Sequence, residues 1–328
     1  MATTQVSTVT ADGVSVFYRH AGPPSAPVIV LLHGFPSSSH QFRNLIPLLA
    51  TRYRVIAPDL PGYGFTVVPE ARNYTYTFAS LTTTFSAFVS ALSLSRFAVY
   101  IFDYGAPTAL RFAIDNPDSI AAIISQNGNA YEEGFGADFW AGIRKLWASR
   151  ADEDRKALAP VVELPFTQWQ YQTGSPNPDK IQPEAYYLDQ ALMERPGNKK
   201  IQLDLLYDYR TNIEFYPRFH EYFRQSKVPV LTAWGKGDPC FIPPGAEAFA
   251  RDVDKDRLMV RWLDASHFAI ETNEKQMADW ILEFLDKYND HEKKAAEWTV
   301  KAEETERRRR DRIARRVQQR PAERLASA

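Results

Sequence analysis

Three ionisable residues stand just after short apolar runs of this 328-residue chain, and together they could carry out nucleophilic chemistry. Asp103 closes one run, Asp238 follows a later run after a glycine-rich turn, and His267 comes soon after the last run. A carboxylate, a second carboxylate and an imidazole in this order could act as nucleophile, orienting acid and general base. Each residue also has a structural alternative: a helix N-cap for Asp103, a loop aspartate for Asp238 and a buried core histidine for His267.

The apolar runs have the length and composition of buried strands, and helical patterns separate them. We expect strands at 13–19, 27–32, 53–57, 97–102, 120–125, 228–234 and 258–263, and helices at 42–49, 76–92, 109–114, 244–251 and 274–288. This alternation predicts a parallel sheet with right-handed crossovers. Because open α/β sheets place their chemistry at the carboxyl edge of the strands, the three ionisable residues should meet there.

Two of the expected turns have the residues that a nucleophilic site requires. The strand before Asp103 is followed by a glycine two positions on and then by a helix, an arrangement that holds the Asp103 side chain above the sheet edge. An earlier strand ends at His33, and Gly34 after it lets backbone amides approach an anion closely. The Phe35 N–H could therefore be one donor of an oxyanion hole, with an ordinary strand-ending turn as the alternative.

The alternation of strands and helices fails from 127 to 227, where the pattern is helical and rich in aromatic residues. We interpret this segment as a helical cap over the carboxyl edge of the sheet, inserted between core segments 1–126 and 228–288. Most of its aromatic side chains should pack within the cap, and a minority should line a pocket. Residues 289–328 have no apolar stripe and should form a charged tail, either a solvated helix or a disordered segment.

Composition argues against several classes of function. The net charge of −1 gives no general attraction to nucleic acid, although the arginines of the tail leave contact with RNA or anionic lipid as an alternative to a plain charged appendage. No apolar stretch is long enough to span a membrane, and the N-terminus has no secretory signal. A single cysteine, Cys240, rules out an internal disulfide, so we expect a cytoplasmic protein. The six histidines show no metal-ligand spacing, so no metal is expected.

Four motifs in a fixed order give the chain a resemblance to a known family. They are His33-Gly34-Phe35-Pro36, Asp103-Tyr104-Gly105-Ala106, Trp234-Gly235-Lys236-Gly237-Asp238 and Ser266-His267-Phe268. Over roughly residues 10–290, the chain resembles α/β-hydrolases of the epoxide hydrolase and haloalkane dehalogenase branch, which use an aspartate nucleophile. The resemblance implies an α/β-hydrolase fold, in which helices flank a mostly parallel sheet and the cap is an insertion.

The resemblance also implies a mechanism that needs neither cofactor nor metal. No Gly-x-Ser-x-Gly occurs, and the nucleophile position holds Asp103, which is ionised at pH 7 because an unperturbed aspartate has a pKa of about 3.9. Asp103 would displace a leaving group at an sp3 carbon and form an alkyl-enzyme ester. Water activated by His267, with Asp238 orienting the ring, would hydrolyse that ester. The N–H groups of Phe35 and Tyr104 would hold the oxyanion.

In epoxide hydrolases, tyrosines of the cap protonate the opening epoxide. Tyr209, in Tyr-Arg-Thr-Asn, resembles one of these tyrosines, and Tyr171 is the candidate for the second. We include Trp169, two residues before Tyr171, in the same substrate-binding set.

In haloalkane dehalogenases, the halide is bound instead by a tryptophan after the nucleophile and by a nearby asparagine or second tryptophan. Here Tyr104 and Phe35 occupy these positions, and neither side chain has an indole or amide group. The chain also departs from the epoxide hydrolase pattern, because Tyr104 replaces the usual tryptophan and Phe102 stands where histidine is common.

The sequence therefore predicts a hydrolase that converts an epoxide in a small, largely apolar substrate to a diol, with water as the second substrate. The first alternative is a dehalogenase of haloalkanes or haloacids. A second alternative is an ester or lactone hydrolase, for which a carboxylate nucleophile would have to form an anhydride. A third is a protein of this fold that binds a ligand without turnover, and the complete triad argues against it.

Overall fold

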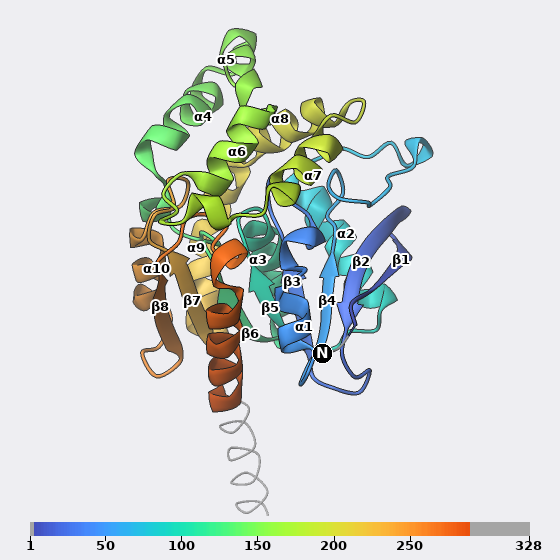
Figure 1. Ribbon diagram of the computed structural model, residues 1–328, viewed down its shortest axis with the longest axis vertical. Coiled ribbons are helices and arrows are strands. Elements are labelled where there is room, and N and C mark those ends of the chain that lie inside the picture. The colour runs from blue at the N-terminus through green and yellow to red at the C-terminus, as the bar shows by residue number, and fades with distance from the viewer. Residues whose placement is uncertain (1–2, 289–328) are drawn as a thin grey trace, which may run out of the picture. The chain divides into compact units, whose positions relative to one another are not determined.

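The computed structural model describes residues 3–288, and an eight-stranded sheet runs through them (Figure 1). The strands are β1 (Gln5–Ala11), β2 (Val14–Ala21), β3 (Val28–Leu32), β4 (Arg54–Pro58), β5 (Phe97–Ile101), β6 (Ile120–Ser125), β7 (Val230–Gly235) and β8 (Leu258–Leu263). They lie in the order β1-β2-β4-β3-β5-β6-β7-β8. Strands β3 to β8 pair in parallel, whereas β2 is antiparallel to both of its neighbours. The prediction of a mostly parallel sheet is confirmed.

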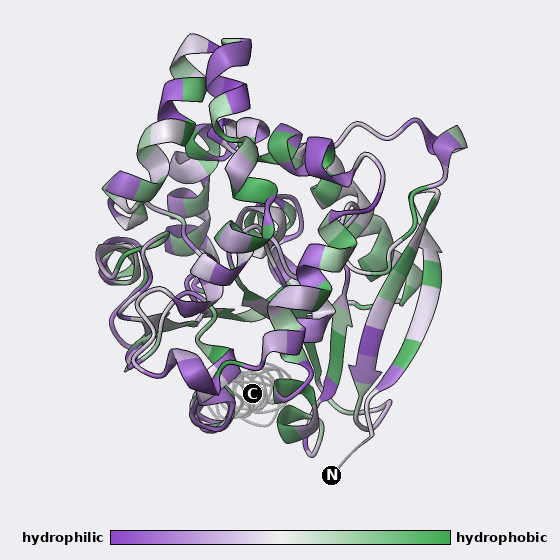
Figure 2. Ribbon diagram, turned by 45° about the horizontal axis from the view of Figure 1, so that its top comes forward, coloured by the Kyte–Doolittle hydropathy of each residue, from purple (hydrophilic) through white to green (hydrophobic). Residues whose placement is uncertain are grey.

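The inner strands of the sheet are more deeply buried than the outer strands. Every residue of β5 is buried, as expected of a parallel strand covered on both faces. Strand β1, at one edge, alternates between exposed and partly buried residues. Figure 2 shows the same contrast, because the outer strands at the right of the view alternate between purple, white and green. The sequence analysis missed β1, since its serine and threonine residues leave only a weak apolar pattern.

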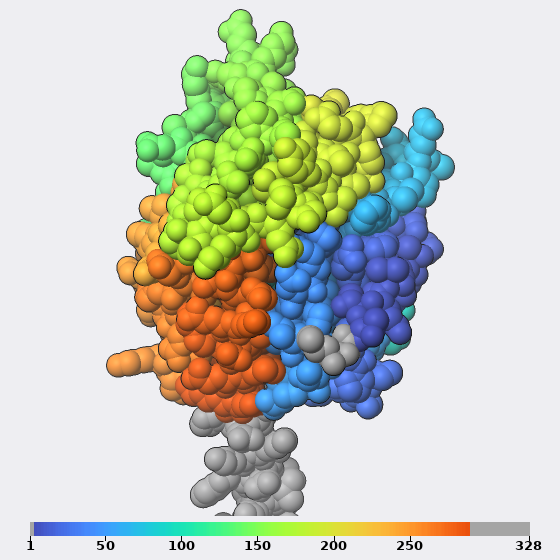
Figure 3. Space-filling view, in the orientation of Figure 1, coloured from blue at the N-terminus to red at the C-terminus, as the bar shows by residue number. Residues whose placement is uncertain are grey.

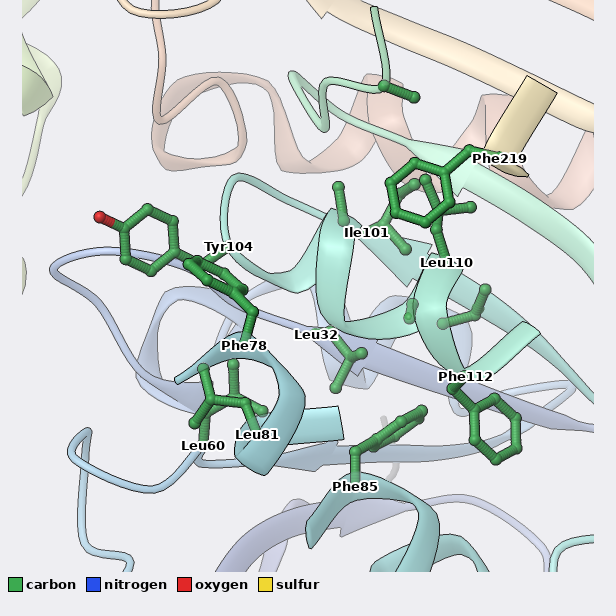
Figure 4. Close-up of a cluster of buried hydrophobic side chains, with 14 of the residues drawn as sticks. Leu32, Leu60, Phe78, Leu81, Phe85, Ile101, Tyr104, Leu110, Phe112 and Phe219 are labelled. Atoms are coloured by element: carbon green, nitrogen blue, oxygen red, sulfur yellow. The ribbon is translucent and has the colours of Figure 1, made fainter. Parts of the chain in front are cut away.

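The helices of the core are α1 (Leu45–Leu49), α2 (Phe78–Ala91), α3 (Gly105–Asp115) and α10 (Pro244–Ala248), and a further helix begins at Ile270. The single helix predicted at 42–49 is wrong in part, because a 3-10 turn precedes α1. Helices α2 and α3 pack on the sheet through a cluster that includes Leu32, Phe78 and Tyr104 (Figure 4). The cluster fixes Tyr104 at the end of β5.

Six helices connect β6 to β7. They are α4 (Ala137–Ser149), α5 (Asp152–Ala157), α6 (Leu164–Gln172), α7 (Pro183–Met193), α8 (Asn198–Asp208) and α9 (Arg210–Ser226). Helices α4 to α8 stand over one end of the sheet, and the space-filling view shows their green and yellow surface covering it (Figure 3). Helix α9 packs beside α3. The insertion is therefore a helical layer that closes one end of the sheet.

The chain up to Ile281 forms one compact unit, which contains every residue of the candidate site. Within residues 3–288, no helix combines the length and the apolar character needed to cross a membrane. The charged tail predicted at 289–328 lies outside the described residues.

Candidate active site

Asp103 lies at the turn between β5 and α3, at the carboxyl edge of the sheet. Its backbone φ is 45°, in the left-handed region that residues other than glycine seldom adopt. Its carboxylate lies against Gly34, where an added Cβ would stand 2.2 Å from Asp103 Oδ1. The residue is only 5% exposed. The turn thus holds a buried carboxylate against the loop that follows β3.

Two backbone N–H groups donate to this carboxylate. The Phe35 N–H donates to Asp103 Oδ1 over 2.6 Å, and the Tyr104 N–H also bonds to the Asp103 side chain. These are the two donors expected from the sequence. Negative charge that develops on this carboxylate would therefore meet donors that are already in position, with the Phe35 N–H on Oδ1.

His33 supports this loop instead of taking part in proton transfer. Its Nε2 accepts a hydrogen bond of 2.9 Å from the Leu60 N–H, and its Nδ1 donates to the Gly34 carbonyl over 3.0 Å. Burial lowers the pKa of His33 and keeps the ring neutral. Since both ring nitrogens are engaged, His33 fixes the backbone that presents the Phe35 N–H.

Burial also changes the acidity of the candidate nucleophile. Removal of the Asp103 carboxylate from water raises its pKa from 3.8 to about 6, although the nearby His267 and the two backbone donors oppose the rise. The unperturbed pKa assumed from the sequence is therefore too low. At pH 7 the carboxylate remains mostly ionised, as nucleophilic attack requires.

Asp238 follows β7, His267 follows β8, and the two side chains form a buried pair. His267 Nδ1 donates to Asp238 Oδ2 over 2.8 Å. Asp238 Oδ1 accepts hydrogen bonds from the N–H groups of Cys240 and Phe241, at 2.7 and 3.0 Å. Each oxygen of this carboxylate thus has a fixed partner, and the imidazole orientation is fixed in turn.

The second nitrogen of His267 is available for a proton. His267 Nε2 is buried and has no hydrogen-bond partner within residues 3–288. Burial lowers the pKa of His267, but the charge of Asp238, its hydrogen bond and the charge of Asp103 outweigh burial, and the pKa is raised. The structure therefore brings together Asp103, Asp238 and His267 at one edge of the sheet, with an imidazole suited to act as a base.

The sequence analysis did not identify Asn127, which belongs to the same network. Asn127 follows β6, and its Nδ2 donates to Asp238 Oδ2 over 2.7 Å. Its Oδ1 accepts from the Gly235 N–H over 2.9 Å, so it also holds the turn before Asp238. The sequence offered one indication of this role: Asn127 follows an apolar run. That run forms β6, which lies in the sheet between β5 and β7, the strands followed by Asp103 and Asp238.

The thiol of Cys240 also lies beside this pair. Ligand atoms of Asp238, Cys240 and His267 all lie within 4.8 Å of one another, so these side chains could hold a metal ion. A metal there would occupy the base and the acid that orients it, which is incompatible with their proposed work. Burial and the charges of Asp238 and Asp103 raise the pKa of the Cys240 thiol, so it stays protonated.

Tyr209 joins α8 to α9 and lies next to the nucleophile turn. Its side chain is fully buried, and its ring centroid is 5.6 Å from that of Tyr104. The one hydrogen bond found for its hydroxyl among the described residues is a long contact of 3.5 Å with the Tyr216 hydroxyl. Burial raises the pKa of Tyr209 well above 10, and the charge of Asp103 adds to the effect. Tyr209 therefore presents a neutral phenol near the carboxylate.

Tyr171 and Trp169, on α6, have different surroundings. The Tyr171 hydroxyl donates to Asp189 Oδ2 over 2.6 Å, and its ring stacks on Phe268 with centroids 3.8 Å apart. Trp169 stacks on Phe139 in the cap. The Tyr171 hydroxyl is thus engaged within the cap, while its ring rests on the residue after His267.

Residues 27–274 match the family described as the alpha/beta hydrolase fold. The chain is 47% identical over 274 residues to the uncharacterized hydrolase YNR064C of Saccharomyces cerevisiae, in an alignment that covers 83% of this chain and 93% of the relative. It is 34% identical over 139 residues to a haloalkane dehalogenase of Psychrobacter cryohalolentis. This alignment covers 42% of this chain and 45% of the relative.

Solved structures share the architecture at lower identity. The epoxide hydrolase CorEH aligns with a TM-score of 0.71 and 20% identity, over 87% of this chain and 99% of that chain. This likeness bears on the fold alone, and it agrees with the mixed eight-stranded sheet, its flanking helices and the match over residues 27–274. The chain belongs to the alpha/beta hydrolase fold family.

Proposed function

We propose that this hydrolase opens an epoxide in a small organic substrate by way of an ester on Asp103 and releases a diol. The observation that carries the proposal is the Phe35 N–H, 2.6 Å from Asp103 Oδ1. An oxyanion hole that already holds one carboxylate oxygen suits a mechanism in which that oxygen becomes the ester carbonyl. The other carboxylate oxygen then remains to attack the substrate.

In the first step, the ionised Asp103 carboxylate attacks an epoxide carbon, and the C–O bond of the ring breaks. The electron pair goes to the ring oxygen, which must gain a proton. Tyr209 is the proposed donor, because its phenol is neutral, buried and beside Tyr104. The product of this step is a hydroxyalkyl ester of Asp103.

In the second step, His267 Nε2 takes a proton from water, and the resulting hydroxide attacks the ester carbonyl. The oxyanion forms on Asp103 Oδ1, where the Phe35 N–H stabilises it, and the Tyr104 N–H bonds to the same carboxylate. Asp238 stabilises the imidazolium through the 2.8 Å hydrogen bond to Nδ1. Collapse of this intermediate breaks the ester C–O bond, and the departing alkoxide takes the proton of the added hydroxyl, which releases the diol and restores the carboxylate. The proton held by His267 then returns to the Tyr209 phenolate left by the first step. The diol oxygen that leaves with the ester comes from Asp103.

Dehalogenation by the same nucleophile is the second candidate, and the similarity to a haloalkane dehalogenase supports it. A halide leaving group needs N–H donors in place of a phenol. The indole N–H groups of Trp140, Trp147 and Trp234 all donate to backbone carbonyl oxygens, at 2.8, 3.1 and 2.7 Å. These three tryptophans are therefore engaged elsewhere, and Trp169 stacks on Phe139 in the cap, so the available phenol of Tyr209 favours the epoxide.

A steady-state comparison of styrene oxide with 1-bromobutane tests the proposal, with diol and bromide as the measured products. We expect diol formation, and we expect Tyr209→Phe to slow it by about 10-fold or more because the ring oxygen loses its acid. Tyr171→Phe is the matched variant: since its hydroxyl is bonded to Asp189, it should have the smaller effect. Bromide release without diol formation would move the function to dehalogenation, and unchanged turnover in Tyr209→Phe would remove this residue from the reaction.

A further inference from the structure

The end of α6 and the loop after it contact the two turns that carry Asp238 and His267. The Tyr171 ring stacks on Phe268, the residue after His267. The Ser266 hydroxyl donates to the Thr173 carbonyl. At Gly174 the backbone approaches Gly237 so closely that an added Cβ would lie 1.8 Å from the Gly237 carbonyl oxygen. These contacts fix the position of α6 relative to the triad.

Gln170 lies on this fixed segment and faces Cys240. Its side chain is nearly fully buried, with 2% of the residue exposed, and its amide makes a hydrogen bond with the Cys240 thiol. Gln170 Oε1 is buried without any hydrogen-bond partner among the described residues, so the bond to the thiol comes from Nε2. The cap therefore contains a buried amide oxygen, Gln170 Oε1, that accepts no hydrogen bond from the described residues.

Cys240 links this acceptor to the reacting groups. The Cys240 N–H donates to Asp238 Oδ1 over 2.7 Å, and the Cys240 thiol experiences the charges of both Asp238 and Asp103. Gln170 therefore lies one side chain away from the acid of the triad. Gln170 is thus connected to the reacting groups through Cys240, whose Sγ lies within 4.8 Å of ligand atoms of Asp238 and His267.

An enclosed acceptor without a donor is unfavourable, and a neighbouring O–H or N–H group removes that cost. Gln170 has no role in the proposed mechanism. The Tyr209 phenol, the His267 imidazole and the backbone donors to Asp103 already account for each step. A substrate with a donor beside its reactive carbon would satisfy the amide and be selected over an apolar one.

We propose that Gln170 is a substrate-binding residue and that the preferred substrate is an epoxy alcohol, with a hydroxyl one carbon from the ring that donates to Gln170 Oε1. This inference rests on the proposed epoxide hydrolysis and narrows its substrate class. It differs from the largely apolar substrate expected from the sequence. The hydroxyl takes no part in bond making, and it orients the ring relative to Asp103.

Two substrates that differ by one hydroxyl test the inference: trans-3-phenylglycidol and trans-2-methyl-3-phenyloxirane. We expect the full-length protein to show a kcat/KM about 10-fold higher for the glycidol, which corresponds to one hydrogen bond to a buried acceptor. Gln170→Leu, and the closer isostere Gln170→Met, should bring the ratio of the two kcat/KM values near one. Gln172→Leu is the matched control, because it lies about 200° further around α6 and should leave the ratio unchanged.

The outcomes separate the inference from the proposed function. If both epoxides are hydrolysed and the wild-type ratio is near one, or the ratio survives in both Gln170 variants, the inference is overturned. If neither epoxide is hydrolysed, the proposed function fails and the inference fails with it. A Gln170-dependent ratio supports both. Thermal unfolding of each variant shows whether the ratio is read from a folded protein.

Discussion

Asp103 should destabilise the folded protein at neutral pH, because the fold buries a carboxylate that the reaction needs in its ionised form. Its pKa rises from 3.8 to about 6 on folding, chiefly through burial. The folded state therefore binds this proton more tightly than the unfolded chain does. The stability that protonated Asp103 contributes is fully present below pH 3.8 and is lost as the pH rises through about 6.

Asp103→Asn removes the charge and keeps the shape. Asparagine tolerates the left-handed backbone at this position, and its Oδ1 can still accept from the Phe35 N–H. The pKa change corresponds to about 3 kcal/mol at pH 8 and, by the same linkage, to about 1 kcal/mol at pH 4.5. We therefore expect the variant to be inactive and more stable, with a Tm about 5–10 °C higher at pH 8 and a smaller gain at pH 4.5.

Thermal unfolding of both proteins at pH 4.5 and pH 8 measures this effect. Asp264→Asn is the control, because the Asp264 side chain is 80% exposed and the same substitution there should change the Tm little at either pH. A variant at Asp103 that is less stable than the wild type at pH 8 would refute the reasoning. So would an equal gain at both pH values, since a charge effect must depend on ionisation.

Three further predictions concern the reaction. The kcat/KM for styrene oxide should fall about 10-fold per pH unit below pH 6, because Asp103 must be ionised to attack, and a flat profile down to pH 4 would contradict this. Gly34→Ala should lower single-turnover ester formation by about 100-fold or more, since its Cβ would stand 2.2 Å from Asp103 Oδ1; near-normal rates would show that the loop can move. Asn127→Gly keeps the positive φ of 47° but removes the hydrogen bond to Asp238, so ester hydrolysis should slow by about 10-fold and the ester should accumulate. An unchanged hydrolysis rate would assign Asn127 a purely structural role.

The sequence was most informative where chain order alone determines position. Asp103, Asp238 and His267 each follow a strand, and parallel strands bring their carboxyl ends to one edge. The order of the apolar runs therefore predicted that these residues meet, and the structure brings them together. The fold class followed from the same alternation. The edge strand β1 was missed, because one of its faces is exposed and its polar residues hide the period.

The hydrogen bonds of the site could not be predicted in this way, because they depend on how loops and the cap dock. Tyr171 matched a family position by type, yet its hydroxyl donates to Asp189, which comes from another cap helix. Asn127 and Gln170 are ordinary polar residues in the sequence, and only burial and their neighbours distinguish them. The raised pKa of Asp103 likewise comes from exclusion of water by the whole fold.

A single turnover in water enriched in 18O tests the central claim most directly. Enzyme in excess over styrene oxide is quenched after one cycle, and mass spectrometry follows the peptide that contains Asp103 and the diol. The ester mechanism predicts 18O in the Asp103 carboxylate and an unlabelled diol in this first cycle, because water attacks the ester carbonyl. Label in the diol with none in the peptide would contradict it, since water would then attack the epoxide directly and Asp103 would not be the nucleophile.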